Sequence, residues 1–312
     1  MAAIEHREGD RAPLNLWNYN GGPGDMGPQA IERYGSVEGW YERFGLDMHT
    51  AFLPLPPLKG RLHQGPLRDD ELEVVEFADL PDTAGDPIKA EIAHHHSKGR
   101  AIFIQINGVH EAAAGLMGIE NALMTQAMER EKFGRLLGQL ADAAIQQAQL
   151  ADKLGADVIH VSDDWGATRG LMFSPADWWE LVYPEEKRIV DEIKRLGKPA
   201  SLHSDGNVND VLEGIVKLGF DVLHPCQTSA GMDPFAIKAE WGDRLTLYGT
   251  LDIVYLLPHA PLAELEAEVT KKMQELKVDG GYLFCTEHAV QTDTTWERIE
   301  LAFDTALKWS WY

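Results

Sequence analysis

The chain is poor in cysteine and has neither long apolar runs nor a signal-like start. Two cysteines among 312 residues are too few for a disulfide framework. No apolar run approaches the roughly 20 residues that a membrane-spanning helix needs, and the charged first residues do not resemble a signal peptide. These absences predict a cytoplasmic protein.

Basic residues are also scarce. There are 28 of them against 50 acidic residues, which gives a formal net charge of −22. Such a surface repels nucleic acid and anionic membranes, because both carry dense negative charge. A polyanionic substrate is disfavoured as well, unless arginines are concentrated at the site. We therefore expect a small-molecule substrate and neither a nucleic-acid nor a membrane partner.

Strand-like and helix-like segments alternate along the chain. Of the residues, 44% are hydrophobic, which is enough for a large core. Regular alternation of this kind requires parallel strands joined by right-handed crossovers. Eight such units predict an α/β fold, a closed (β/α)8 TIM barrel, with an open doubly wound sheet as the alternative. We expect one domain over residues 1–312, with a hairpin-like insert at about 58–82. The expected strands cover residues 13–18, where apolar and polar residues alternate, and residues 45–52, 100–106, 156–162, 198–203, 220–225, 245–249 and 281–285. Ser174 and Pro175 predict the start of a helix, with the Ser174 hydroxyl as its cap.

Polar residues gather directly after these strands. Barrel enzymes build their sites at the carboxyl ends of the strands, although polar strand ends are common in any α/β protein. The residues that follow the strands are Asn18, His49, Asn107, Asp163, Asp164, His203, Asp205, Gln227, Asp252, Cys285 and His288. Among them, we expect substrate contacts from Asn18, Asn107, Asp163 and Gln227.

His203 and Asp205 form the most suggestive pair. Side chains two apart on an extended strand point the same way, so the imidazole and the carboxylate converge on one point. A lone histidine here is more often a hydrogen-bonded barrel residue, and a lone cysteine such as Cys285 is more often a small buried hydrophobe. The presence of all three at strand ends favours a site.

Asp163 and Asp164 are adjacent carboxylates at a strand end. They could simply cap the following turn. Alternatively, one orients a neighbour while the other takes a proton, in which case Asp164 is the catalytic residue. His288 is a second catalytic candidate, acting as an acid or as a partner of the other site residues.

Several of these segments together resemble a known family. The chain is similar to the uroporphyrinogen decarboxylase superfamily, which also contains zinc-dependent methyltransferases that work with corrinoids. The resemblance extends from about Phe103 to the end of the chain. It is carried by Gly155 to Gly166, Ser174-Pro175, Tyr183-Pro184, His203-Ser-Asp-Gly206, Gly219-Phe-Asp-Val, Leu247 to Asp252, and Cys285 to Gln291.

One departure favours the methyltransferase branch. The decarboxylases carry an amino-terminal Arg-Gln-Ala-Gly-Arg element that holds the acidic side chains of the porphyrinogen. The matching residues 14–22 contain no arginine, and only Arg169 lies near a predicted site loop. An octacarboxylate bound to a chain of this charge would need bidentate arginine clamps.

The resemblance implies a zinc site. His203 matches the family's histidine ligand and Cys285 its late cysteine ligand, while Asp205 stands where the family has another cysteine. A set of histidine, carboxylate and thiolate is acceptable to zinc. The implied function is a zinc-dependent methyltransferase that moves a methyl group between a small methylated substrate or thiol and a corrinoid (cobalamin), free or held by a corrinoid protein.

Two alternatives remain open. One is a metal-free decarboxylase for a small carboxylate substrate, with Asp164 or Asp205 stabilising a protonated intermediate. The other is a binding protein without catalytic activity.

Overall fold

The computed structural model describes residues 1–17, 27–59 and 76–312. The chain divides into two compact units. The first unit contains Met1–His49, Gly99–Ala101 and Asp221–Tyr312, and the second contains Thr50–Lys98 and Ile102–Phe220. Strand β1 (Met48–Phe52) begins in the first unit and continues in the second.

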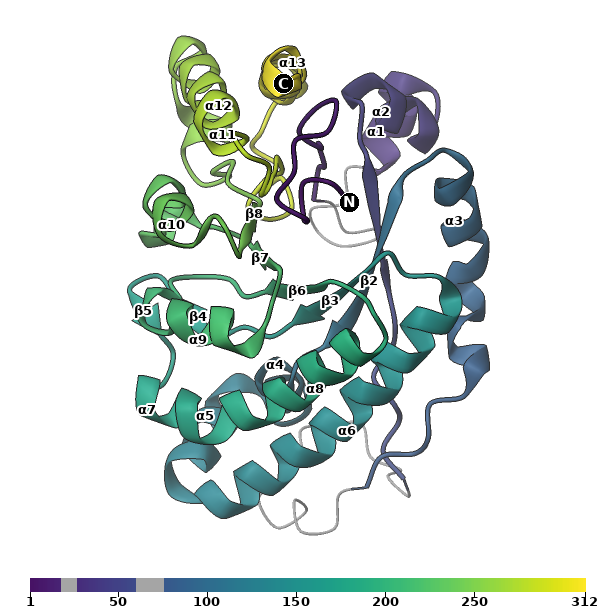
Figure 1. The fold of residues 1–312 in the computed structure, drawn as a ribbon, viewed down its shortest axis with the longest axis vertical. Helices are drawn as coiled ribbons and strands as arrows, with labels where there is room; N and C mark the ends of the chain where they lie inside the picture. The colour runs from purple at the N-terminus through teal and green to yellow at the C-terminus, as the bar shows by residue number, and fades with distance from the viewer. Residues whose placement is uncertain (18–26, 60–75) are drawn as a thin grey trace. The chain divides into compact units, whose positions relative to one another are not determined.

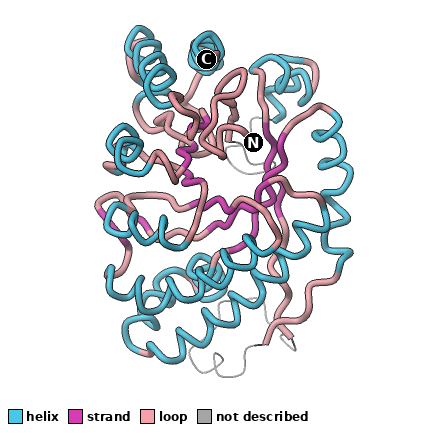
Figure 2. The backbone as a smooth tube through the Cα atoms, in the orientation of Figure 1, coloured by secondary structure: helices cyan, strands magenta, loops and turns pink. Residues whose placement is uncertain are grey.

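The second unit is built on parallel strands, as predicted. Strand β3 (Val158–Ser162) lies between β2 (Ala101–Asn107) and β6 (Ala200–His203) and pairs in parallel with both. Helices α6 (Arg130–Leu154) and α8 (Tyr183–Arg195) run side by side and contact β3 and β6 (Figures 1 and 2). Every residue of β3 and β6 is buried, including the histidine and the serine that each strand contains.

Other elements of this unit surround those strands. Ser174 accepts a hydrogen bond from the Asp177 amide (3.0 Å), which confirms the predicted cap of the helix that follows. The remaining elements are η1 (Asp82–Gly85), α3 (Asp86–Ser97), α4 (Val109–Met117), α5 (Ile119–Met128), β4 (Gly166–Ala167), β5 (Gly170–Leu171), α7 (Pro175–Asp177), the π-helix η2 (Trp178–Val182), η3 (Asn209–Val211) and α9 (Leu212–Leu218).

The first unit has the same architecture. Strand β8 (Thr246–Tyr248) pairs in parallel with both β7 (Val222–His224) and β9 (Tyr282–Leu283). Helices α12 (Leu262–Leu276) and α13 (Trp296–Ser310) pack side by side (Figure 1). The unit also contains α1 (Gly27–Tyr34), α2 (Val37–Phe44), η4 (Thr228–Ala230), α10 (Pro234–Trp241) and α11 (Leu256–His259).

The strand expected at residues 13–18 is reduced to a bridge in its described part, residues 13–17. Leu14 forms an isolated parallel bridge with Phe284. The Phe284 amide donates to Pro13 O and the Asn15 amide to Phe284 O, but the Leu14 amide donates to the Asp47 side chain instead of a strand (2.8 Å). The side chain has taken the place of a ladder partner, and proline supplies no donor of its own.

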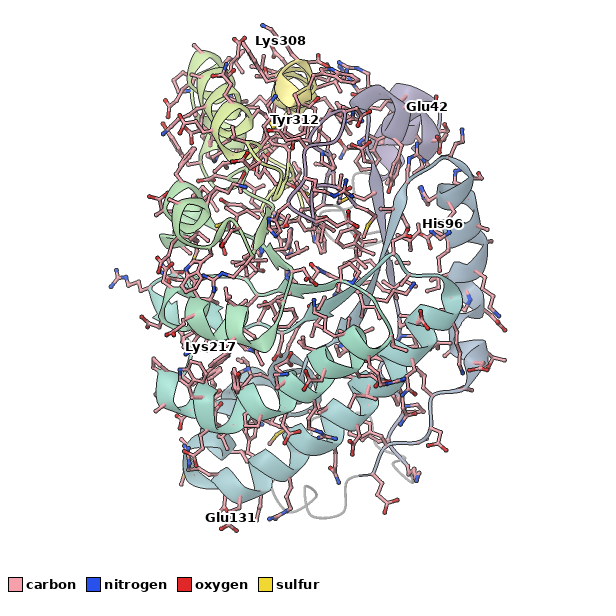
Figure 3. The ribbon with its side chains drawn as sticks, in the orientation of Figure 1. Glu42, His96, Glu131, Lys217, Lys308 and Tyr312 are labelled. Carbon is pink, nitrogen blue, oxygen red and sulfur yellow. The ribbon has the colours of Figure 1, made fainter. Side chains whose placement is uncertain are left out.

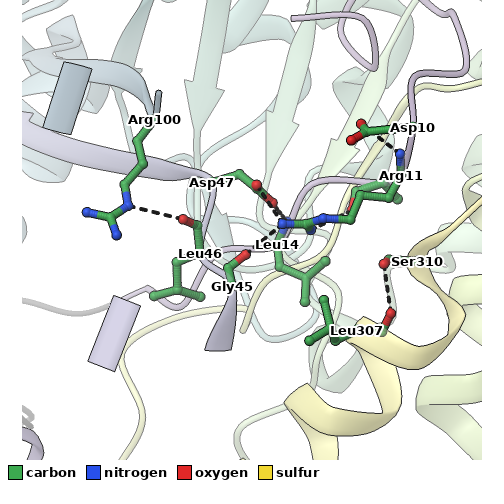
Figure 4. Close-up of polar contacts among 10 residues, drawn as sticks. Asp10, Arg11, Leu14, Gly45, Leu46, Asp47, Arg100, Leu307 and Ser310 are labelled. Atoms are coloured by element: carbon green, nitrogen blue, oxygen red, sulfur yellow. Dashed lines mark hydrogen bonds and ion pairs between the residues drawn. The ribbon is translucent and has the colours of Figure 1, made fainter. Parts of the chain in front are cut away.

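Arg11 holds this bridge in place (Figure 4). Its guanidinium donates to Gly45 O (3.0 Å) and pairs with the Asp47 carboxylate (2.7 Å). The arginine nearest to residues 14–22 is therefore engaged in an internal contact.

The predicted insert is described only at its edges. Leu58 and Phe77 form an antiparallel bridge, as a hairpin would, while residues 60–75 lie outside the described part of the chain. Both units are α/β structures with parallel strands, and the single-domain organisation stays a prediction. Glu131 of α6 and Lys308 of α13 are exposed and extend away from the ribbon in Figure 3.

Candidate active site

The site in the second unit begins with a row of strand ends. Asn107 is in register with Ser162, and Ser162 with His203, so β2, β3 and β6 end at one level. The Asp163 amide donates to His203 O (2.9 Å) and continues the row by one residue. This shared edge brings together residues that are about 40 to 100 positions apart in the sequence.

His203 faces two carboxylates at this edge. Its Nε2 lies 3.9 Å from Asp164 Oδ1 and 4.0 Å from Asp205 Oδ1. The Asp205 amide donates to Asp164 Oδ1 (2.8 Å), so the end of β3 holds the loop after β6. Both carboxylate side chains are 35% exposed and the His203 side chain is 4% exposed. The structure thus brings together three predicted residues, Asp164, His203 and Asp205.

The electrostatics of this group follow from partial burial among like charges. Burial raises the pKa of Asp205 to about 6; the nearby His203 opposes this shift, whereas Asp164 and Glu111 add to it. His160 lies on β3, two residues before Ser162. It is fully buried, and its Nδ1 lies 2.8 Å from Ser201 Oγ. Burial and the neighbouring His203 hold the pKa of His160 well below its usual range, so that imidazole is neutral.

Asp163 is committed to internal contacts. Its Oδ1 accepts from the Glu111 amide (2.6 Å) and its Oδ2 from the Trp165 indole (2.6 Å), and the side chain is fully buried. Burial, followed by the charge of Glu186, raises the pKa of Asp163 well above its usual range. Substrate binding by Asp163 stays a prediction.

Glu186 completes the support of helix α4. Its Oε1 accepts from the Val109 amide (3.1 Å) and it is fully buried. Asp163 and Glu186 together accept two of the amides that a helix start leaves unpaired. Close packing also requires Gly108, since a Cβ there would lie 2.2 Å from Asp163 Cβ.

Sequence reasoning missed two residues of this site because both lie on α4. Glu111 accepts a hydrogen bond from Ser162 Oγ through its Oε2 (2.7 Å). His110 is fully buried, with Nδ1 3.2 Å from Asp164 O and Nε2 3.1 Å from Gln126 Oε1. The available signal was the sequence Asn107-Gly-Val-His-Glu, two ionisable residues directly after a strand end.

Asn107, a predicted substrate contact, is half-buried and pairs with Gln147. Gln147 Nε2 donates to Asn107 Oδ1 (3.0 Å), and the Asn107 amide donates to Gln147 Oε1 (3.2 Å). This pair fixes the end of β2. Its role in substrate binding stays a prediction.

Cys285, Gln227 and His288 belong to the first unit. Cys285 is fully buried and its Sγ lies 3.9 Å from Thr286 Oγ1. Burial raises the pKa of this thiol to about 12, against hydrogen bonds to Thr286 and Tyr248 that lower it. Gln227 and His288 are half-buried, and Gln227 Nε2 donates to Ser229 Oγ (3.3 Å). Asn18 lies outside the described residues.

The donor set at His203 fits zinc in its chemistry. Two ligands of one tetrahedral zinc lie roughly 3.3–3.5 Å apart when each bond is about 2.0–2.2 Å long. The nitrogen–oxygen distances at His203 are 3.9 and 4.0 Å, so a closure of about half an ångström would suffice. Imidazole and carboxylate are both ordinary zinc ligands.

These observations define an α/β protein with an acidic, histidine-containing site at the ends of parallel strands. A family model described as uroporphyrinogen decarboxylase (URO-D) matches residues 94–309, and the chain belongs to this family.

Relatives within and around the family carry different names. Uroporphyrinogen decarboxylase from Carboxydothermus hydrogenoformans is 26% identical over 174 residues, which are 54% of this chain and 46% of that protein. The chain therefore spans about half the length of the curated relatives it matches.

Two solved structures share the fold. A methyltransferase from Methanosarcina mazei matches with a TM-score of 0.75 at 17% identity, covering 98% of this chain and 96% of that one. A B12-independent methionine synthase from a Shewanella species matches with a TM-score of 0.55 at 12% identity, covering 96% and 93%. At these identities the likeness shows the fold alone.

No helix in the described ranges is both long and apolar enough to cross a membrane.

Proposed function

We propose that this protein is a zinc-dependent methyltransferase built on a closed (β/α)8 barrel. It would move a methyl group between a small methylated substrate or thiol and a corrinoid, free or bound to a corrinoid protein. The observation that carries the proposal is His203 with carboxylate oxygens of Asp164 and Asp205 at 3.9 and 4.0 Å. One of the matched structures is named a methyltransferase, which is in line with methyl transfer.

The residues take the following roles in this proposal. His203 and Asp205 hold zinc, and Cys285 is a third ligand on the strength of the sequence resemblance. Zinc, when bound, supplies a Lewis acid that polarises the methylated group or acidifies a thiol. Asp164 is a proposed catalytic residue, which also accepts the Asp205 amide and so orients the loop that carries Asp205. His288 is the second proposed catalytic residue, as an acid or as a partner of the other site residues. Asn18, Asn107, Asp163 and Gln227 are the proposed substrate contacts.

A decarboxylase is the second candidate, because the curated relatives carry that name. The positions of the arginines argue against the porphyrinogen itself as the substrate. Residues 14–22 contain no arginine, and Arg11 is held by Asp47 and Gly45. A smaller carboxylate substrate fits this candidate better.

Metal content separates the two candidates. Untagged protein, expressed with ample zinc and dialysed gently, should contain about one zinc ion per chain by plasma mass spectrometry. His203→Ala and Cys285→Ser should each lose most of it, since removing a ligand is more damaging than the 10–100-fold loss typical of outer contacts. His288→Ala should only weaken binding.

Cys226→Ser is the matched control, because Cys226 is equally buried and also follows a strand end. It should keep the metal. Wild-type protein with far less than one ion per chain, together with metal-independent release of CO2 from a small carboxylate substrate, would favour the decarboxylase.

A further inference from the structure

We propose that Glu111 is the acid–base residue of this site, the group that gives or takes the proton when the substrate bond changes. The reaction class, methyl transfer, rests on the proposed function, whereas Glu111 is identified from its contacts in the structure. No other acid in the described part of the second unit combines the features set out below.

Glu111 is held at the strand ends by two independent contacts. Its backbone amide donates to Asp163 Oδ1 (2.6 Å), which fixes the first turn of α4. Its Oε2 accepts from Ser162 Oγ (2.7 Å), and Ser162 is in register with His203. A carboxyl group held at both its backbone and its side chain is pre-organised, as an efficient proton-transfer group requires.

The neighbouring acids are already occupied. Asp163 uses both oxygens on Glu111 and Trp165, and Glu186 accepts from the first amide of α4. Asp164 holds the amide of Asp205, which is itself the proposed ligand. Within the described residues, the side chain of Glu111 makes one hydrogen bond, from Ser162 to Oε2. Its Oε1 is the oxygen left for a substrate.

The surroundings also favour a proton on Glu111. Burial raises its pKa, the charge of Asp164 adds to this, and the Ser162 hydrogen bond opposes it. The charged group that acts on this carboxyl is Asp164, at the end of β3. Glu111 in turn raises the pKa values of Asp163 and of Asp205 after β6. A raised pKa makes the protonated form of the carboxyl more available as a proton donor.

Methyl transfer from a neutral donor needs such a group. When the C–O bond of a methyl ether breaks, its electron pair stays on oxygen, and that oxygen takes the proton of Glu111. The methyl group bonds to the electron pair of the acceptor, a reduced corrinoid. In the opposite direction a thiol gives its proton to the Glu111 carboxylate as its sulfur takes the methyl group. A sulfonium donor leaves as a neutral sulfide, so no proton moves.

This difference gives the test. Zinc-loaded wild type and Glu111→Gln are compared with reduced cobalamin as acceptor and either 2-methoxyphenol or trimethylsulfonium as donor. The amide can still accept from Ser162, so the fold is preserved. Glu111→Gln should lower kcat for 2-methoxyphenol about 10²–10⁴-fold, the usual contribution of general acid catalysis, and leave trimethylsulfonium nearly unchanged. Glu120→Gln, an exposed acid on the next helix, should change neither rate. An equal loss with both donors, or no loss with either, would overturn the proposal.

A second measurement separates this inference from the proposed function. If wild type transfers methyl from neither donor, the methyltransferase assignment fails. The role of Glu111 is then tested by measuring the pKa of its carboxyl group. In protein labelled with ¹³C at the glutamate carboxyls, the NMR signal missing from Glu111→Gln should titrate above the range of exposed glutamates. A signal that titrates within that range rejects Glu111 as the acid–base residue.

Discussion

The carboxylate of Asp164 accepts the backbone amide of Asp205 at 2.8 Å. This hydrogen bond joins two acids that are 41 positions apart in the sequence. Through it, the end of β3 fixes the position of the loop after β6. The same Asp164 oxygen lies 3.9 Å from His203, so a change at Asp164 affects the backbone and the electrostatics of the site together.

Substitutions at Asp164 separate these two effects. Asp164→Asn keeps an oxygen for the Asp205 amide but removes a negative charge, so the free energy of unfolding should change little and the pKa of Asp205 should fall toward its ordinary value. Asp164→Ala removes the acceptor as well, and should cost about 1 kcal/mol because water can reach the partly exposed amide. Urea unfolding and NMR titration of Asp205 measure the two quantities. Equal losses of stability in the two variants would contradict this division.

Gly108 and Gly115 form a natural pair for testing the packing of α4. A Cβ at Gly108 would lie 2.2 Å from Asp163 Cβ and 2.9 Å from Ser162 O, whereas a Cβ at Gly115 meets nothing within 4 Å. Gly108→Ala should therefore destabilise the protein by about 1–3 kcal/mol or more. Gly115→Ala should be neutral or stabilising by up to about 1 kcal/mol. Chemical denaturation measures the free energy of unfolding of both variants. Similar values would show that Gly108 and Asp163 do not pack closely enough to exclude a Cβ at position 108.

Glu186 gives stability a defined pH dependence. Burial raises its pKa from 4.5 to about 7, so the folded protein keeps a proton there that the unfolded chain releases. The folded state binds more protons between these values, and the free energy of unfolding therefore falls as pH rises from about 4.5 to about 7. The change is at most about 3 kcal/mol, since one pKa unit corresponds to about 1.36 kcal/mol.

Glu186→Gln should remove this dependence, because an amide oxygen can still accept from Val109 and no longer titrates. Relative to wild type, the variant should be more stable at pH 8 than at pH 5, as measured by urea unfolding at both values. Glu180→Gln is the control, because Glu180 is exposed and should leave the pH profile unchanged. Parallel profiles for wild type and Glu186→Gln would refute the assignment.

Prediction from sequence succeeded where local pattern and final contacts agree. The buried strands β3 and β6 and the Ser174 cap depend on neighbours in the chain, and all three were predicted. The strand at residues 13–18 was predicted from alternation alone, but the Asp47 side chain takes the Leu14 amide from 33 positions away.

The same limit applies to the site. The roles of Asp163 and Glu111 depend on a helix that follows a different strand, 52 positions earlier than Asp163. The sequence predicted that Asp163 and Asp164 either cap a turn or divide their roles, but it did not indicate that one of them supports a helix. In the structure one of them supports a helix and the other faces the imidazole of His203.

Asp163 and Glu186, the buried acids that accept the first amides of α4, also affect the order in which the unit assembles. Val109 and Glu111 donate their amides to side chains from α8 and from the end of β3, the first of which lies 77 positions later in the chain. The first turn of α4 therefore lacks the Glu186 acceptor until α8 has been synthesised and has docked. During synthesis on the ribosome this turn should remain unprotected longer than α6, whose amides are satisfied within the helix itself. Glu111, whose partners Asp163 and Ser162 belong to the end of β3, would be placed before that step, so the site would form in two stages.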